Sequence, residues 1–339
     1  MSVRRRLAVT VGVLASVLLA SMVLALFVGS AGLPPGAVLS ALLGHPNVEA
    51  VTRVVVLDLR LPRILAAALA GGALAVAGAS LQALTRNPLA EPSVLGVSSG
   101  AAFGVVAGQL FGLGSGLLDA LGLTAFAFAG AFVAGGVVYL IAAGAGGLSV
   151  HALLLAGVIV GIFFSSAIAV LISLVDTNRL GAIVQWLLGN VSPVPPAALT
   201  VFTLVTLVGF FVILADARRL NLLALGEDAA RELGVDALAV KRRIFAGAAL
   251  LVSAVVAFAG PIGFVGLIVP HALRMLLGPD NRVLVPAAVL GGAIFLLVAD
   301  TLARNIAAPA ELSVGVLTAF CGAPFFVFLL RARGLRVLP

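Results

Sequence analysis

Residues 244–273 read IFAGAALLVSAVVAFAGPIGFVGLIVPHAL and contain no charged side chain. The stretch is thirty residues long, and one membrane-spanning helix needs about 20 apolar residues. It is therefore too long for one ordinary span, although it is short for two. Gly-Pro-Ile-Gly at residues 260–263 lies in its middle, and such a sequence breaks a helix. We expect two spans that meet at this break.

The rest of the chain carries further apolar runs of spanning length. Of its 339 residues, 62% are hydrophobic and 10% are charged, whereas a soluble domain averages about 25% charged residues. The first run exceeds the apolar region of a signal peptide, so we expect a retained helix. Outside the quoted stretch, the runs lie near residues 7–28, 64–84, 94–113, 121–143, 152–175, 197–215, 284–303 and 312–330.

The basic residues decide between nine and ten spans. Three arginines lie in residues 4–6 and three in residues 331–336, and basic ends favour the cytoplasm. Both ends on one side require an even number of spans. Ten spans place 15 basic residues inside and five outside. The sequence therefore predicts an all-α polytopic membrane protein with about ten helices and cytoplasmic termini. The five outside residues are Arg53, Arg60, Arg63, Arg179 and Arg304.

The residues offer little for catalysis or for ion-coupled transport. A nucleotide-binding P-loop ends in Gly-Lys-Ser/Thr, but the single lysine, Lys241, is followed by Arg242. The three histidines lack metal-ligand spacing. Asp300 is the main ionisable residue within a span, and Arg304 at i+4 is its expected ion-pair partner. We therefore expect no cofactor, metal or nucleic acid on this chain, and any ATP and magnesium on a partner subunit.

The cytoplasmic segment at residues 225–236 has the pattern of a docking element. Its charged residues leave an apolar face, and Glu227 and Arg231 stand at i, i+4. Gly234 fits a helix end in the left-handed conformation, and Asp236 fits the cap of a second short helix. Two interpretations remain open for this segment, which are docking onto a soluble partner and a solvated amphipathic loop. On the outer side, we expect an interfacial helix at about residues 179–190.

Four blocks in this order resemble the FecCD-type permeases, the membrane subunits of ABC importers for iron–siderophores, haem and cobalamin. The resemblance runs from about residue 55 to the C-terminus. The blocks are LRLPR at 59–63, NPLAEP at 87–92 followed by LGVS at 95–98, GEDAARELG at 226–234, and GPIGFVGLIVPH at 260–271.

The resemblance implies a single permease domain, residues 1–339, with the type II ABC importer fold. It implies a homodimer in the bacterial cytoplasmic membrane, two ATPase subunits below it, and a periplasmic or lipid-anchored binding protein above it. The carried substrate would be a metal chelate, with iron–siderophore before haem and cobalamin. The alternative is a secondary carrier or channel that needs no ATPase.

The family's motifs also imply roles for particular residues. Arg60, Arg63 and Arg304 would dock the binding protein, and the alternative that remains open for them is snorkelling or ion pairing with Asp58 or Asp300. Val150 and His151 depart from the small hydroxyl residues of the cobalamin permease. Coupling to the ATPase falls on Gly226, Glu227, Asp228, Arg231, Glu232 and Gly234; binding-protein docking on Arg60, Arg63 and Arg304; and the cytoplasmic gate on Asn87, Leu89, Ser149, Val150 and His151.

Overall fold

Long apolar helices make up nearly all of the fold. The computed structural model describes residues 2–29, 32–110, 122–144, 147–175, 177–308 and 310–332. Within them, seven helices are long and apolar enough to cross a membrane, and three shorter apolar helices accompany them. These ten helices match the ten predicted runs in position. They are α1 (Val3–Phe27), α4 (Leu61–Thr85), α5 (Val97–Leu110), α6 (Gly122–Ala142), α7 (Val150–Ser173), α9 (Pro196–Ala215), α12 (Ala237–Ala259), α13 (Val265–Leu277), α14 (Asn281–Ile306) and α15 (Val314–Ala332).

Short elements connect these helices. One of them is a two-residue antiparallel hairpin, in which Ala143 pairs with Leu148. The connecting elements are α2 (Pro35–Leu42), α3 (Ala50–Arg53), the π-helical η1 (Val54–Arg60), the 3-10 helix η2 (Pro92–Leu95), β1 (Ala143–Gly144), β2 (Gly147–Leu148), α8 (Thr177–Leu187), α10 (Ala217–Leu223) and α11 (Glu227–Glu232).

The predicted break between two spans is confirmed. Helix α12 ends at Ala259 and α13 begins at Val265, with Gly260 at φ 70° and Phe264 at φ 69°. A positive φ strains any residue with a side chain, so Phe264 needs support. The carboxylate of Glu91, between α4 and α5, accepts a hydrogen bond of 2.6 Å from the Phe264 backbone N–H. The connection after α4 thus holds the start of α13.

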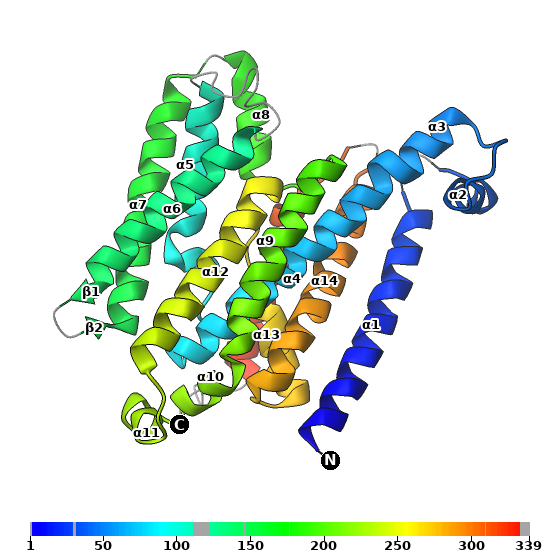
Figure 1. Ribbon diagram of the computed structural model, residues 1–339. Coiled ribbons are helices and arrows are strands. Elements are labelled where there is room, and N and C mark those ends of the chain that lie inside the picture. The colour runs from blue at the N-terminus through cyan, green and yellow to red at the C-terminus, as the bar shows by residue number, and fades with distance from the viewer. Residues whose placement is uncertain are drawn as a thin grey trace.

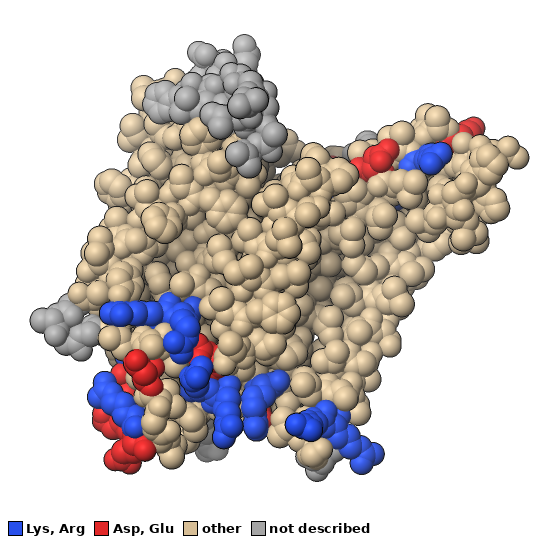
Figure 2. Space-filling view, viewed as in Figure 1, with Lys and Arg blue, Asp and Glu red and all other residues tan. Residues whose placement is uncertain are grey.

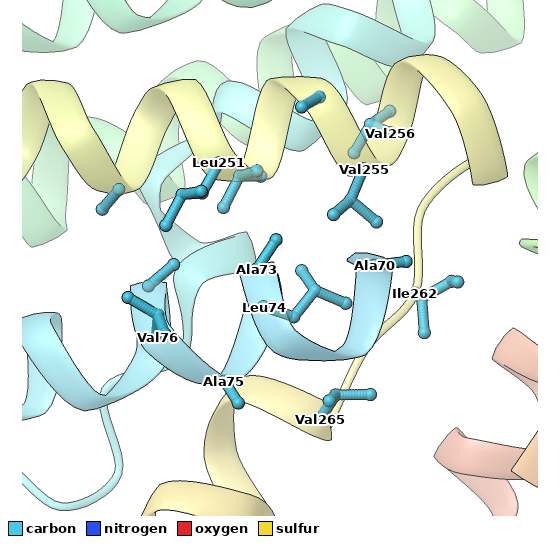
Figure 3. Close-up of a cluster of buried hydrophobic side chains, with 14 of the residues drawn as sticks. Ala70, Ala73, Leu74, Ala75, Val76, Leu251, Val255, Val256, Ile262 and Val265 are labelled. Carbon is cyan, nitrogen blue, oxygen red and sulfur yellow. The ribbon is translucent and has the colours of Figure 1, made fainter. Parts of the chain in front are cut away.

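Helix α4 forms the centre of the bundle. In the most apolar part of the helical stretch Ala50–Thr85, 89% of the residues are buried, whereas none are buried in the most apolar part of α1. Figure 3 shows alanine, leucine and valine side chains of α4 lying between α12 on one side and the α13 segment on the other. Gly71 and Gly292 bring α4 against α14, because a Cβ on Gly71 would lie 2.1 Å from the Gly292 carbonyl oxygen. Small residues allow this close approach of helix backbones.

Two helices begin earlier than the sequence predicted. The second helical stretch was predicted from residue 64 but starts at Ala50, through η1 into α4. The helix after the coupling segment was predicted from residue 244 but starts at Ala237, so the expected second short helix is the first part of α12. Hydropathy marks the membrane boundary, whereas backbone hydrogen bonds continue until a capping residue ends them. Asp236 is that cap, and its Oδ1 accepts from the Ala239 N–H at 3.0 Å.

The two ends of the bundle differ in charge. Figure 1 shows the start of α1 with α10 and α11 at one end, and α2, α3 and α8 at the other. Of the described residues visible in Figure 2, most charged side chains gather at the end with α10 and α11, and uncharged residues cover the middle. Arg6 at the start of α1 donates to the Leu277 carbonyl at the end of α13. This distribution fits the predicted cytoplasmic side.

A helix lies where the interfacial helix was expected, at about residues 179–190: it is α8, Thr177–Leu187, at the end of the bundle opposite α11 (Figure 1). The segment that follows it is tied to the helix break. Asn190 donates its backbone N–H to the Ala259 carbonyl at 2.9 Å, and Gly315 donates to the Gly189 carbonyl at 3.0 Å. The outer segment therefore joins the end of α12 to the beginning of α15.

Candidate coupling and gating site

Helix α11 lies between α10 and α12 at the end of the bundle that carries most of the visible charged side chains (Figures 1 and 2). Gly226 precedes it with φ 115° and Gly234 follows it with φ 78°, both in the region that favours glycine. The predicted left-handed helix end at Gly234 is therefore confirmed. Arg231 lies 3.8 Å from Glu227 and 3.4 Å from Asp228, which confirms the predicted i, i+4 pair.

The outer surface of α11 is both charged and apolar. The Asp228 side chain is 96% exposed, and Glu232 is also exposed. Leu225 and Leu233, on either side of the helix, are 67% and 59% exposed. Such leucines among charged residues lie outside the apolar middle of the molecule, so lipid does not explain them. Both leucines are therefore exposed beside the charged residues of α11.

The inner side of α11 contacts the single lysine of the chain. Lys241 of α12 is 7% exposed. Its Nζ lies 2.6 Å from Glu227 Oε1 and donates to the Leu148 carbonyl oxygen at 2.9 Å. A buried ammonium needs such partners, because its removal from water is costly. Lys241 therefore joins α11 to strand β2.

A cavity of about 470 Å³ opens beside Lys241. Three of the five predicted gate residues, Ser149, Val150 and His151, line it together with Glu227 and Lys241. Ser149 caps α7, and its hydroxyl accepts from the Ala152 N–H at 3.4 Å. The structure thus brings one predicted gate segment and the first residue of the coupling helix to the same cavity.

The other two predicted gate residues lie at the end of α4. Asn87 Oδ1 accepts from the Leu89 N–H at 2.9 Å, which closes a tight turn after Arg86. Arg86 itself lines the cavity, whereas Asn87 and Leu89 do not. The turn at Asn87 and Leu89 therefore lies next to Arg86, at the edge of the Lys241 cavity. Of the two gate elements, only the segment from Ser149 to His151 lines that cavity.

Two aspartates fix α10 at this end. Asp216, just before α10, is fully buried and lies 2.6 Å from both Arg243 and Arg219. Burial would raise the pKa of this carboxyl, but the hydrogen bonds from the two arginines hold it below its usual value. Asp280, before α14, accepts from Arg282 and from the Asn221 amide at 2.7 Å, and these bonds lower its pKa to about 2. Helix α10 is thus anchored to α12 and α14.

The three arginines predicted to dock the binding protein line one cavity, but they are buried. Their exposed fractions are 5% for Arg60, 7% for Arg63 and 6% for Arg304. Arg304 Nε lies 3.2 Å from Asp300 Oδ2, so the predicted i, i+4 ion pair is confirmed. Arg60 donates instead to the Leu26 carbonyl of α1 at 2.7 Å. All three line a cavity of about 410 Å³ that also contains Asn190, Ser192 and Glu311.

Sequence reasoning did not assign a role to Lys241. A signal was present, because the buried residues Val240, Ile244 and Ala248 form an apolar stripe on α12 and Lys241 falls within it. A charged residue on such a stripe needs a buried partner. One of its two partners, the Leu148 carbonyl, is a backbone group 93 residues away, and no sequence pattern identifies it.

Comparisons with known proteins agree with this architecture. A cobalamin import system permease protein of Halobacterium salinarum is 42% identical over 293 residues, covering 86% of this chain and 77% of the relative. A hemin transport system permease protein of Yersinia pestis is 41% identical over 276 residues, covering 81% of this chain and 82% of the relative.

A solved structure shares the whole fold. It is described as a metal-chelate type ABC transporter in an inward-facing conformation, and it matches with a TM-score of 0.83 and 33% identity over 95% of this chain and 98% of that chain. The model of the FecCD transport family matches residues 17–332. This chain therefore belongs to the FecCD transport family, as a membrane-spanning permease subunit of an ABC importer.

Proposed function

We propose that this permease carries a metal chelate into the cytoplasm and that separate ATPase subunits supply the energy. ATP and magnesium would bind to those subunits, because the single lysine is not part of a P-loop. The residues offered to the ATPase are the charged side chains of α11, with the glycines on either side of it. The observation that carries the proposal is the exposure of Leu225 and Leu233 around this charged helix.

The substrate class follows from the relatives. Their names state transport of cobalamin and hemin, and the solved structure is of the metal-chelate type. Both substrates are metal ions held by large organic ligands. We place iron–siderophore first, with haem and cobalamin as the alternatives.

The outer arginine cavity is our candidate contact for a substrate-binding protein, either periplasmic or lipid-anchored. The three arginines and their carboxylate partners, Asp300 and Glu311, form one charged cluster at this cavity. Its formal charge is therefore positive. Among the described residues, Arg60 has no carboxylate within ion-pair distance, which leaves it as the arginine best placed for an acidic side chain of a partner.

The assembly that we propose is a homodimer with two ATPase subunits in the bacterial cytoplasmic membrane. The family resemblance supports this composition, and the charge difference between the two ends of the bundle supports the orientation. The gate would comprise the turn at Asn87 and Leu89 and the segment from Ser149 to His151.

The test is transport by the reconstituted complex. The permease is assembled with its ATPase and binding protein in liposomes, and uptake of radio-iron siderophore, haem and cobalamin is compared with and without ATP. We expect ATP-dependent uptake of one chelate. Uptake without the ATPase would support a secondary carrier instead, and an intact complex that carries none of the three would reject the substrate class.

A further inference from the structure

The side chain of Lys241 connects the helix offered to the ATPase with the segment that begins α7. We propose that Lys241 is a positioning residue that transmits displacement of α11 to the gate hairpin, defined as β1 (Ala143–Gly144), β2 (Gly147–Leu148) and Ser149. The inference rests on the proposed function, because it takes α11 as the contact of the ATPase. It adds a specific link between that contact and the gate.

The two bonds of the ammonium point to different elements. Glu227 Oε1 at 2.6 Å belongs to α11, and the Leu148 carbonyl oxygen at 2.9 Å belongs to β2. An ammonium group has three donors and no acceptor, so it can hold both oxygens at once. Both distances are those of charge-assisted or short hydrogen bonds. A shift of Glu227 therefore pulls on a group that is also bonded to Leu148.

The position of Leu148 makes this bond consequential. Leu148 is 3% exposed, and it pairs with Ala143 in the two-stranded hairpin. Ser149 follows immediately and caps α7. Because no flexible residue separates Leu148 from the cap, movement of its carbonyl changes the first turn of α7, where Val150 and His151 line the cavity.

Among the described residues, the other ion pairs of α11 stay within that helix. Arg231 binds Glu227 and Asp228 within α11 itself, and its side chain is 64% exposed. Exposed pairs of this kind contribute little. Lys241, by contrast, is buried and lies on α12, which contacts both α11 and β2. It is the residue through which a charged group of α11 is connected to the gate hairpin.

The experiment measures nucleotide-dependent change at the gate. Cys321, the single cysteine, is replaced by Ser, and His151→Cys supplies a reporter whose position is exposed. Maleimide labelling of the permease–ATPase complex is timed without nucleotide and after trapping with ATP and vanadate. In the reporter background we expect trapping to change the labelling rate. With Lys241→Met we expect ATPase binding and hydrolysis to persist and the change in rate to disappear. Substrate carried per ATP should fall by about tenfold, an ordinary size for coupling between sites.

The controls separate transmission from folding. Arg282→Met removes a cation that pairs with Asp280 at the same end, and it should retain the nucleotide response. Gel filtration reports assembly of each variant. If Lys241→Met does not give a monodisperse complex, Lys241→Leu, which also removes every donor, is judged by the same outcomes. Glu227→Gln, which weakens the ion pair at its other end, should reduce the response.

The possible results are distinct. A nucleotide response that persists in the Lys241 variants would overturn the inference, and so would loss of ATPase binding in those variants alone, because Lys241 would then serve docking. ATPase binding is measured first on the permease without substitutions, and if that protein fails to bind the ATPase, the proposed function is wrong and the inference falls with it.

Discussion

Arg63 and Asp300 are 237 residues apart in sequence, yet they form a buried ion pair that joins α4 to α14. Arg63 Nη2 lies 3.0 Å from Asp300 Oδ1, and its Nε donates to both carboxylate oxygens. Glu311 accepts from Arg63 Nη1 at 2.8 Å, and Arg304 lies on the other side of Asp300. One fully buried carboxylate thus compensates two nearly buried guanidinium groups.

Loss of the Asp300 charge should destabilise the permease strongly. Asp300→Asn leaves Arg304 with no carboxylate and Arg63 with Glu311 alone among the described residues. Removing one partner of a buried ion pair costs about 3–5 kcal/mol. We expect a clear fall in Tm and in the yield of monodisperse protein in detergent. Asp58→Asn is the control at the same end, because Asp58 is exposed. Equal melting of the two variants would show that the cluster is hydrated rather than buried.

The contact between α4 and α14 at Gly71 gives a second prediction. A Cβ at this position would lie 2.1 Å from the Gly292 carbonyl oxygen, and that atom belongs to the backbone. Gly71→Ala must therefore push the helices apart, at a cost of about 1–3 kcal/mol. Gly12→Ala is the matched control, since nothing lies within 4 Å of its Cβ. In thermal unfolding we expect Gly71→Ala to lower Tm and Gly12→Ala to leave it unchanged or higher. The reverse order would exclude close packing at Gly71.

Much of the helical architecture was predictable because it depends on local patterns. Apolar runs and the Gly-Pro sequence at residues 260–261 located ten helices and the break between two of them. The early start of α12 could not be read from hydropathy, since three consecutive basic residues, 241–243, separate its first turn from the apolar run. Its cap, Asp236, was predicted correctly, but the helix that follows was expected to be short.

The partners of the buried charges were less accessible to sequence reasoning. Asp300 and Arg304 are four residues apart, so their ion pair followed from helix periodicity. The bonds of Arg60 to Leu26 and of Lys241 to Leu148 end on backbone carbonyls of other helices or strands. Any residue type can supply a carbonyl, and no pattern of side chains marks it. The tertiary packing of the helices alone decides which carbonyl is used.

Glu91 should be required for the start of α13. Its carboxylate accepts from the Phe264 N–H at 2.6 Å, and Phe264 holds a positive φ. Glu91→Leu leaves this donor unpaired, and an unsatisfied buried group costs about 1–3 kcal/mol. We expect faster hydrogen exchange in peptides covering residues 260–268, measured by mass spectrometry.

Glu91→Gln provides the comparison, because its amide oxygen remains an acceptor of the same length. Exchange in this variant should stay close to that of the wild type. If both variants exchange alike, then the charge or the packing of Glu91, and not its hydrogen bond, maintains the break.

The anchor between α10 and α14 should give the permease an acid-sensitive component of stability. The pKa of Asp280 is lowered from 3.8 to about 2 by the hydrogen bonds from Arg282 and Asn221. A carboxyl whose pKa is lower in the folded state binds protons more readily when unfolded. Its contribution is therefore present above about pH 4 and is lost as the pH falls toward about 2. We expect Asp280→Asn to lower Tm at neutral pH, with a difference from wild type that shrinks on acidification. Asp228→Asn, at a side chain that is 96% exposed, should shift Tm little at any pH. A difference for Asp280→Asn that does not vary with pH would contradict this prediction, because the lost stability would then not depend on ionisation of the Asp280 carboxyl.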